Sequence, residues 1–340
     1  MGDAFPQLRV AAVHAASPFL DRDAGVEKAC NLIADAARNG ARLVVFPETF
    51  IPGYPFWIWT HTPATSGALF LRLYANSVEL KSSATARIGQ AAKRAGCYVV
   101  IGVSERDGGT LYNTLLYFDD LGEIVGRHRK LQPTSVERTV WGRGDGSDLR
   151  IVEATIGRLG GLICWEHSMD LARYALTSQG EQIHIAAWPA ISAVTHDPSS
   201  SVFDDLTEAA ARHHAAAGQC FVINSQSCID ASTIEELGLC GRTEMIREGG
   251  GWSAIIGPSG RIISGPHRDT ETILYGDLDF AEITGFKYVS DSAGHYARPD
   301  VLQLHVDYRP QKIAVAQGLD LTTWTPGTTD EASAATENDE

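Results

Sequence analysis

Hydrophobic and polar positions along this chain follow two rhythms, one with the period of a strand and one with the period of a helix. Short apolar runs bounded by turn residues indicate strands, and apolar residues three and four apart indicate amphipathic helices. The predicted strands are Leu8–Ala16, Arg42–Phe46, Tyr98–Val103, Leu111–Phe118, Leu149–Glu153, Arg158–Ile163, Gln182–Ala187, Cys220–Asn224, Trp252–Ile256, Arg261–Ser264 and Ile273–Leu278. The predicted helices are Arg22–Asn39, Ser82–Gly96, Leu171–Ser178, Val202–Ala217 and Phe280–Val289. This alternation predicts an α/β fold in which helices cover layered sheets.

Neither hydrophobic period is present in two long segments, Ile51–Leu73 and Asp230–Gly251. Irregular segments of this length inside a compact domain are usually functional or disordered, and the aromatic residues of the first argue against disorder there. No repeat and no linker rich in Pro, Gly or Ser divides the body of the chain. We therefore expect residues 1–310 to form a single domain and residues 311–340 an extended or disordered acidic tail.

Composition narrows the classes of partner. The chain has 340 residues, of which 44% are hydrophobic, so it can bury a large core without external staples. Its net charge of -14, about -9 without the acidic tail, argues against nucleic acids and anionic membranes as partners. No secretion signal or membrane-spanning run is evident, and six scattered cysteines without CxxC spacing fit reduced thiols. We expect a cytoplasmic protein.

One of these cysteines has unusual surroundings. The strand Arg158–Ile163 leads directly into Cys164, and a sharp turn and a helix follow. A nucleophile at such a turn is exposed at the edge of a sheet, near backbone N–H groups that could hold an oxyanion. A buried, inert cysteine remains the alternative from the local pattern. A metal site at Cys164 and His167 is disfavoured, because no second pair of ligands has matching spacing.

Two charged residues are also candidates for the chemistry. Glu48 ends the run Leu43–Glu48, and Lys130 ends the basic run Gly126–Lys130. Taken alone, each could be a solvated surface residue. Together with a thiol they make chemical sense: burial raises the proton affinity of a carboxylate, and a nearby ammonium favours the thiolate. Such a Glu–Lys–Cys cluster would raise the pKa of the carboxyl and lower the pKa of the thiol, which brings the two values closer together.

The segments around these three residues carry a resemblance. Phe46–Phe50, His128–Thr134 and Gly161–Glu166 closely resemble the nitrilase superfamily, in its order and approximate spacing. Val136–Ser147 and Asp291–Asp300 are similar to the true nitrilase branch rather than to the amidase branches. The resemblance covers about residues 8–305. It implies a four-layer α-β-β-α sandwich, which agrees with the predicted elements.

The resemblance also implies an activity, the hydrolysis of an organic nitrile to a carboxylic acid and ammonia through a thioimidate and an acyl-enzyme. Cys164 would be the nucleophile, Glu48 the general base and acid, and Lys130 the cation that stabilises the tetrahedral species. Glu137 would be the family's second glutamate, and the N–H of Trp165 a second oxyanion donor. No metal or organic cofactor is implied.

Substrate choice and assembly are further expectations. His167 stands where many relatives carry Asn, and we interpret it as a residue that tunes the site. Tyr54, Trp57, Trp59 and Trp188 are candidates for a pocket that takes an aromatic, arylaliphatic or medium aliphatic nitrile. Members of this branch commonly form dimers that build spiral oligomers, so a homo-oligomer is expected.

Rival interpretations remain open at this point. An amidase of the same superfamily would share Glu48, Lys130 and Cys164, and a nitrile or cyanide hydratase would stop at the amide. A cysteine α/β-hydrolase with His295 and Asp279 as partners would need a G-x-C-x-G elbow, which the sequence around Cys164 lacks. A scaffold without catalysis has no need for a charged pair beside a thiol.

Overall fold

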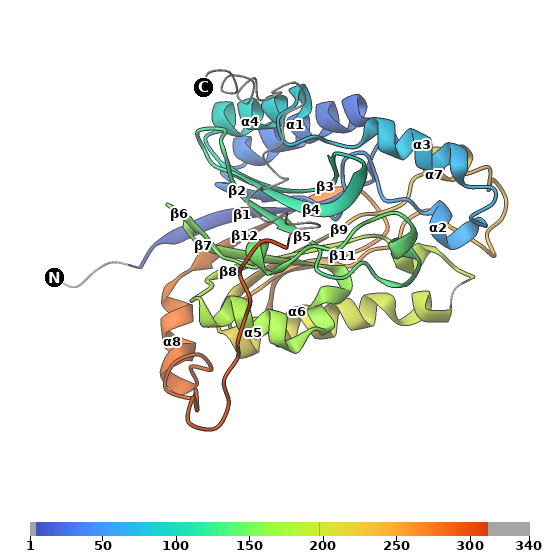
Figure 1. Cartoon of the computed structure of the whole chain (residues 1–340). Helices are drawn as coiled ribbons and strands as arrows, with labels where there is room; N and C mark the ends of the chain where they lie inside the picture. Colours follow the sequence, from blue (N-terminus) through green and yellow to red (C-terminus); the bar gives the residue numbers. More distant parts are fainter. Residues whose placement is uncertain (1–4, 197, 312–340) are drawn as a thin grey trace, which may run out of the picture.

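The computed structural model describes residues 5–196 and 198–311. Two six-stranded sheets lie face to face, with α1 (Arg22–Arg38) and α4 (Ser83–Ala95) outside one sheet and α5 (Asp170–Ser178) and α6 (Phe203–Gly218) outside the other (Figure 1). The predicted α-β-β-α sandwich is therefore confirmed. All but the first residue of the predicted tail, Gln311–Glu340, lies outside the described residues.

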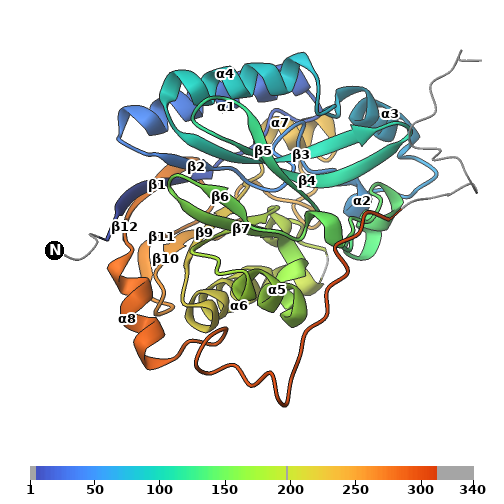
Figure 2. The same cartoon turned by 60° about the vertical axis from the view of Figure 1, so that its left-hand side comes forward.

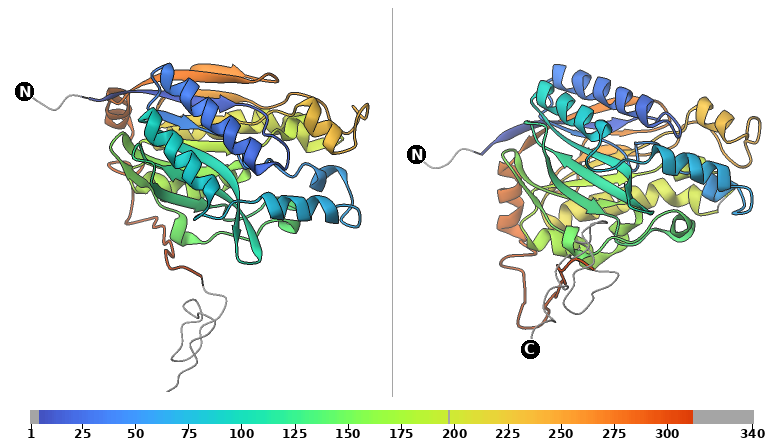
Figure 3. Two further views of the ribbon diagram at one scale, coloured as in Figure 1. Left: turned by 90° about the horizontal axis from the view of Figure 1, so that it is seen from above. Right: turned by 45° about the horizontal axis from the view of Figure 1, so that its top comes forward.

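The first sheet has the order β12-β1-β2-β3-β4-β5. Its strands are β1 (Gln7–His14), β2 (Leu43–Val45), β3 (Tyr98–Asp107), β4 (Thr110–Phe118), β5 (Ile124–Arg129) and β12 (Thr272–Asp279). The three strands β1, β2 and β3 run parallel, and antiparallel partners lie on both sides of them. Seen from above in Figure 3, α1 and α4 lie next to each other across this sheet.

The second sheet repeats this plan with the order β11-β10-β9-β8-β7-β6. Its strands are β6 (Val152–Ala154), β7 (Gly157–Ile163), β8 (Ile183–Trp188), β9 (Phe221–Gln226), β10 (Ser253–Ile256) and β11 (Ile262–His267). Again three parallel strands, β7 to β9, form the centre. Figure 2 shows α5 and α6 packed together on the outer face of this sheet, and α8 (Ala281–Val289) near its end.

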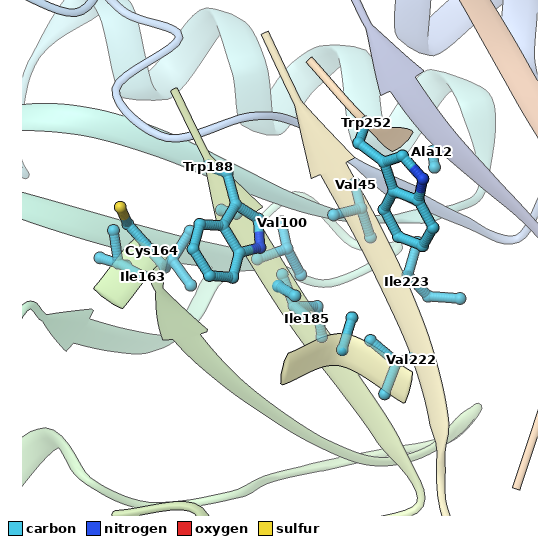
Figure 4. Close-up of a cluster of buried hydrophobic side chains, with 14 of the residues drawn as sticks. Ala12, Val45, Val100, Ile163, Cys164, Ile185, Trp188, Val222, Ile223 and Trp252 are labelled. Carbon is cyan, nitrogen blue, oxygen red and sulfur yellow. The ribbon is translucent and has the colours of Figure 1, made fainter. Parts of the chain in front are cut away.

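The main hydrophobic core fills the space between the sheets. Val45 and Val100 from the first sheet meet Ile185, Val222 and Ile223 from the second, and all five side chains are buried (Figure 4). Strands that are covered on both faces need continuous apolar runs rather than an alternating pattern. The sequence of β2 and its neighbours satisfies that need, which is why these strands were predictable.

Local signals fix the helix ends. The side chain of Asp21 accepts from the Ala24 N–H at the start of α1, and Ser82 and Thr85 form a capping box at the start of α4. Gly96 ends α4 in the left-handed conformation, with φ of 60°, as the sequence predicted. No helix among the described residues is long and apolar enough to cross a bilayer.

The two irregular segments contain short helices that the sequence did not predict. They are α2 (Trp57–Thr60), α3 (Gly67–Asn76) and α7 (Ala231–Glu236). In α2 and α7 the helical stretch is only a turn or so long, which is too short for a hydrophobic period to be recognised. Figure 1 places all three at one end of the sandwich.

Candidate active site

Strand ends bring the three predicted catalytic side chains into one region. Glu48 follows β2, and Lys130 follows β5, which runs parallel to β2 within the first sheet. Cys164 follows β7 of the facing sheet, at the start of a 3₁₀ turn, Cys164–Ser168. The carboxyl ends of parallel strands meet at the same edge of a sheet, where ligand sites collect. The site thus lies between the two sheets and takes residues from both.

Lys130 is the centre of the charge arrangement. Its ammonium Nζ donates to Glu48 Oε1 at 3.1 Å and to Glu137 Oε2 at 2.7 Å, and all three side chains are buried. Burial by itself would lower the pKa of Lys130, but the charges of Glu137 and Glu48 raise it above its ordinary value. The lysine therefore stays charged, and it holds both carboxylates in place.

Glu48 is suited to exchange protons near neutral pH. Burial raises the pKa of its carboxyl to about 7, although Lys130 opposes that shift. Oε1 also accepts from Asn113 Nδ2 at 2.5 Å. Oε2 is buried and receives no hydrogen bond from any described residue, so this atom is free to take up and return a proton.

The environment of Cys164 corrects two expectations. The side chain is buried, with 1% exposure, so the expected exposure at the edge of the sheet was wrong. Burial also raises the pKa of the thiol well above its usual range, although Lys130 and a hydrogen bond from the Trp165 N–H act in the opposite direction. The surroundings therefore bring the two pKa values closer only by raising that of Glu48, and the thiol of Cys164 is protonated in the resting site.

The backbone of Cys164 is unusual as well. Its φ of 54° lies in the left-handed region, which costs a non-glycine residue roughly 1–2 kcal/mol. Strain of this kind persists only where the surroundings hold it, and it is common at functional sites. Here it turns the chain sharply at the end of β7.

A third buried carboxylate, which sequence reasoning missed, connects the nucleophile to the lysine segment. Glu166 accepts from the backbone N–H groups of Ile163 and Leu131, each at 2.7 Å, and from His128 Nε2 at 3.0 Å. Burial would raise the pKa of Glu166, but His128 and these donors hold it below its ordinary value. The neighbours of Cys164 and Lys130 are thus joined through one side chain. The motif around Cys164 contained Glu166, but nothing in its spacing indicated these partners.

Tyr54 and Trp59 contact the charge cluster through their polar atoms. Trp59 Nε1 donates to the Tyr54 hydroxyl at 3.0 Å, and that hydroxyl donates to Glu137 Oε1 at 2.9 Å. Glu137 Oε2 also accepts from the Thr134 N–H at 2.7 Å. Two of the four predicted pocket aromatics therefore help to orient Glu137.

The other two predicted pocket aromatics lie apart from each other. Trp57 is buried and packs edge-on against Phe19, and it borders a cavity of about 420 Å³ that also touches Val136 and Val140 on either side of Glu137. Trp188 stacks on His167 with ring centroids 4.8 Å apart. Figure 4 shows its six-membered ring toward Cys164 and its indole nitrogen pointing away.

His167 lies at the site, whereas the two partners that a cysteine α/β-hydrolase would need, Asp279 and His295, make other contacts. His167 is buried directly behind the nucleophile, and its Nδ1 lies 2.7 Å from the carbonyl oxygen of Cys164. Asp279 instead accepts from the Ala281 N–H at the start of α8, and His295 packs against Tyr296. The structure thus gives that pair other roles.

Comparisons with known proteins give matches both in sequence and in fold. The profile of the carbon–nitrogen hydrolase family matches residues 9–288. A nitrilase from Pseudomonas syringae pv. syringae is 43% identical over 91% of this chain and 92% of its own length. An aliphatic nitrilase from Rhodococcus rhodochrous is 44% identical over 88% and 83%. A carbon–nitrogen hydrolase from Helicobacter pylori has the same fold, with a TM-score of 0.68 and 19% identity over 83% of this chain and 92% of that one.

Proposed function

The chain belongs to the carbon–nitrogen hydrolase family, within its nitrilase branch, and on that basis we propose that it is a nitrilase with Cys164 as its nucleophile. It converts an organic nitrile and two waters to a carboxylic acid and ammonia. The observation that carries the proposal is the free, buried Oε2 of Glu48, on a carboxyl whose pKa is about 7, held by Lys130.

The first half of the reaction forms a thioimidate. Glu48 Oε2 takes the proton of the Cys164 thiol as the sulfur attacks the nitrile carbon, and it returns that proton to the nitrile nitrogen. Because the resting thiol is protonated, proton transfer and attack are coupled. We assign stabilisation of the developing negative charge to the Lys130 ammonium and the Trp165 N–H, both of which act on the Cys164 thiol in the resting site.

The second half releases the products. Glu48 deprotonates a water that adds to the thioimidate carbon, and it passes this proton to the nitrogen. It then transfers the remaining hydroxyl proton to the nitrogen as the carbon–nitrogen bond breaks, so that ammonia leaves and an acyl-enzyme remains. A second water, activated in the same way, cleaves the thioester to the carboxylic acid. Glu137 and Tyr54 keep Lys130 and Glu48 aligned throughout.

The substrate that we propose is an aromatic, arylaliphatic or medium aliphatic nitrile. Supporting this, the polar atom of Trp59 bonds Tyr54 and that of Tyr54 bonds Glu137, which leaves the apolar ring atoms of both side chains to line a pocket. Trp188 adds a buried ring beside the nucleophile, and Trp57 completes the candidate set. Turnover confined to cyanide or acetonitrile would contradict this assignment.

The decisive experiment measures ammonia release from phenylacetonitrile, benzonitrile, a dinitrile, a four-carbon aliphatic nitrile and the matching amides. The wild type should release ammonia from nitriles, Cys164→Ala should release none, and Cys97→Ala should behave as the wild type. Cys97 is a matched control because it is a buried, free cysteine behind the first sheet. Release from amides alone would indicate an amidase, and accumulation of amide without ammonia would indicate a hydratase.

A homodimer that builds a spiral homo-oligomer, in the cytoplasm, completes the proposal. Large apolar side chains on the outer helices support an interface. Leu171 and Tyr174 of α5 are 69% and 37% exposed, and Leu206 of α6 is 41% exposed. Size-exclusion chromatography at micromolar concentration tests assembly, and a monomer would contradict it.

A further inference from the structure

Behind the nucleophile lies a chain of buried polar side chains that the proposed reaction does not use. His167 Nε2 is 2.9 Å from His184 Nε2, and His184 Nδ1 is 2.7 Å from Glu181 Oε1. Glu181 Oε2 is 2.9 Å from His214 Nε2. None of these side chains is more than 2% exposed. The chain therefore extends from the turn at Cys164, across β8, to helix α6.

The hydrogen bonds in this series of side chains require one proton more than neutral histidines and a carboxylate supply. A carbonyl oxygen only accepts, so the Nδ1 of His167 must carry a hydrogen to bond the Cys164 carbonyl. The next two contacts, from His167 to His184 and from His184 to Glu181, need one hydrogen each. Two neutral imidazoles and a carboxylate supply only two hydrogens for these three bonds. This series of side chains therefore holds one additional proton.

That proton belongs on His184. Glu181 keeps its charge, because His184 and His214 lower the pKa of its carboxyl to about 2 against the effect of burial. Burial and the neighbouring His184 lower the pKa of His167 well below its usual value, so His167 stays neutral. His184, placed between them, donates from both ring nitrogens, and its positive charge is balanced by Glu181 at 2.7 Å.

A bound metal ion explains this cluster less well. Glu181, His184 and His214 are the residue types that ligate zinc, and their ligand atoms lie within 4.8 Å of one another. Nitrogen and oxygen ligands of a tetrahedral zinc are about 3.3 Å apart, given bonds of about 2 Å. The two nitrogens here lie 2.7 and 2.9 Å from different carboxylate oxygens, which are hydrogen-bond distances. Protons account for the geometry.

We propose that His184 is a positioning residue for the nucleophile: as a doubly protonated link between Glu181 and His167, it fixes the His167 ring that holds the Cys164 carbonyl. The held carbonyl belongs to the residue with the left-handed backbone, so the network maintains the turn that aims the thiol. Trp188, stacked on the face of the His167 ring, limits its movement. This role deepens the proposed function and rests on it.

Four variants test the link. In His184→Asn the shorter amide reaches Glu181 and loses His167, whereas in His184→Gln the longer amide still reaches His167. His167→Asn keeps a donor for the Cys164 carbonyl and loses His184, and the double variant His167→Asn/His184→Asn completes a cycle. A matched control is His14→Asn, since His14 is buried and bonds Ser253 in another part of the core.

The readouts are kcat for nitrile hydrolysis and the rate at which iodoacetamide alkylates Cys164, resolved by peptide mass spectrometry. We expect His184→Asn to lose roughly 10- to 100-fold in both with little change in KM, and His184→Gln to recover much of that loss. The double variant should be no slower than His167→Asn. The proposal would be overturned if the fold-losses of the two single variants multiplied in the double variant. A loss below twofold in His184→Asn would overturn it as well.

Alkylation separates this inference from the proposed function, because it requires the thiol but no nitrile hydrolysis. If nitriles are not turned over but the alkylation rates follow the expected order, only the proposed function fails. If His184→Asn does not fold, ¹⁵N-histidine NMR of the wild-type protein at pH 7 decides the matter. The ring of His184, assigned by the loss of its signals in His184→Gln, should show two protonated nitrogens, and a neutral His184 ring would refute the assignment.

Discussion

Glu137 offers a sharp test of the charge arrangement, because glutamine removes its negative charge and keeps its shape. Lys130 Nζ lies 2.7 Å from Glu137 Oε2 and 3.1 Å from Glu48 Oε1. The two carboxylate oxygens are therefore within about 6 Å of each other, where like charges repel by about 3 kcal/mol at an effective dielectric constant of about 20. That repulsion corresponds to roughly 2 units in the pKa of Glu48.

In Glu137→Gln we therefore expect the pKa of Glu48 to fall from about 7 by roughly 1–2 units. Glu48 must be ionised to accept the thiol proton, so the acidic limb of the kcat/KM profile should move to lower pH by the same amount. A less basic Glu48 also takes the thiol proton less readily. The plateau of kcat/KM should accordingly fall by roughly 10- to 100-fold.

The assay is the initial rate of ammonia release from the best nitrile substrate between about pH 5 and pH 9. Glu105→Gln serves as the matched control, because Glu105 is equally buried and pairs with Arg127 and Arg129 instead of Lys130. Its acidic limb should stay in place. An acidic limb that stays put in Glu137→Gln, or that moves equally in the control, would refute the electrostatic reasoning.

Three further outcomes follow from the same side chains. The folded state binds more protons than the unfolded chain between pH 4.5 and about 7, because the pKa of Glu48 is raised across that range, so stability should fall as pH rises through it. Glu48→Gln should remove that loss and raise Tm at alkaline pH, and a lower Tm there would contradict it. Glu166→Gln should cost about 2–4 kcal/mol in urea unfolding, since one amide oxygen cannot serve two N–H groups and His128. Cys164→Gly and Cys164→Ala should both be inactive. The free energy of unfolding of Cys164→Gly should be about 1 kcal/mol higher than that of Cys164→Ala, because glycine relieves the strain of the left-handed backbone.

The layers of the fold were predictable because the central strands of both sheets are continuous apolar runs, whereas β5, with the sequence IVGRHR, is not such a run and was not predicted. Ser82 and Gly96 even marked the start and end of α4. The short helices α2 and α7 escaped prediction because their brief helical stretches leave no period to detect.

At the site, motifs identified residues, and only the fold showed their partners. Asn113 and Glu181 carry no local signal, because their contacts cross from one strand or helix to another. Of the adjacent pair His213 and His214, only the second is buried in the network, a difference that helical position alone did not reveal. The protonated thiol was missed for a related reason, since the degree of burial depends on the facing sheet.

The pairing of β1 with β12 has a consequence for synthesis of the chain. Gln7 lies opposite Asp279, and this antiparallel ladder continues to His14 and Thr272. A nascent chain on the ribosome therefore carries β1 with one unpaired edge until almost the whole sandwich has been translated. Unpaired, largely apolar strand edges are sites of aggregation, and contacts between such distant residues slow folding. We expect truncations before residue 272 to aggregate and chaperone demand during expression to be high.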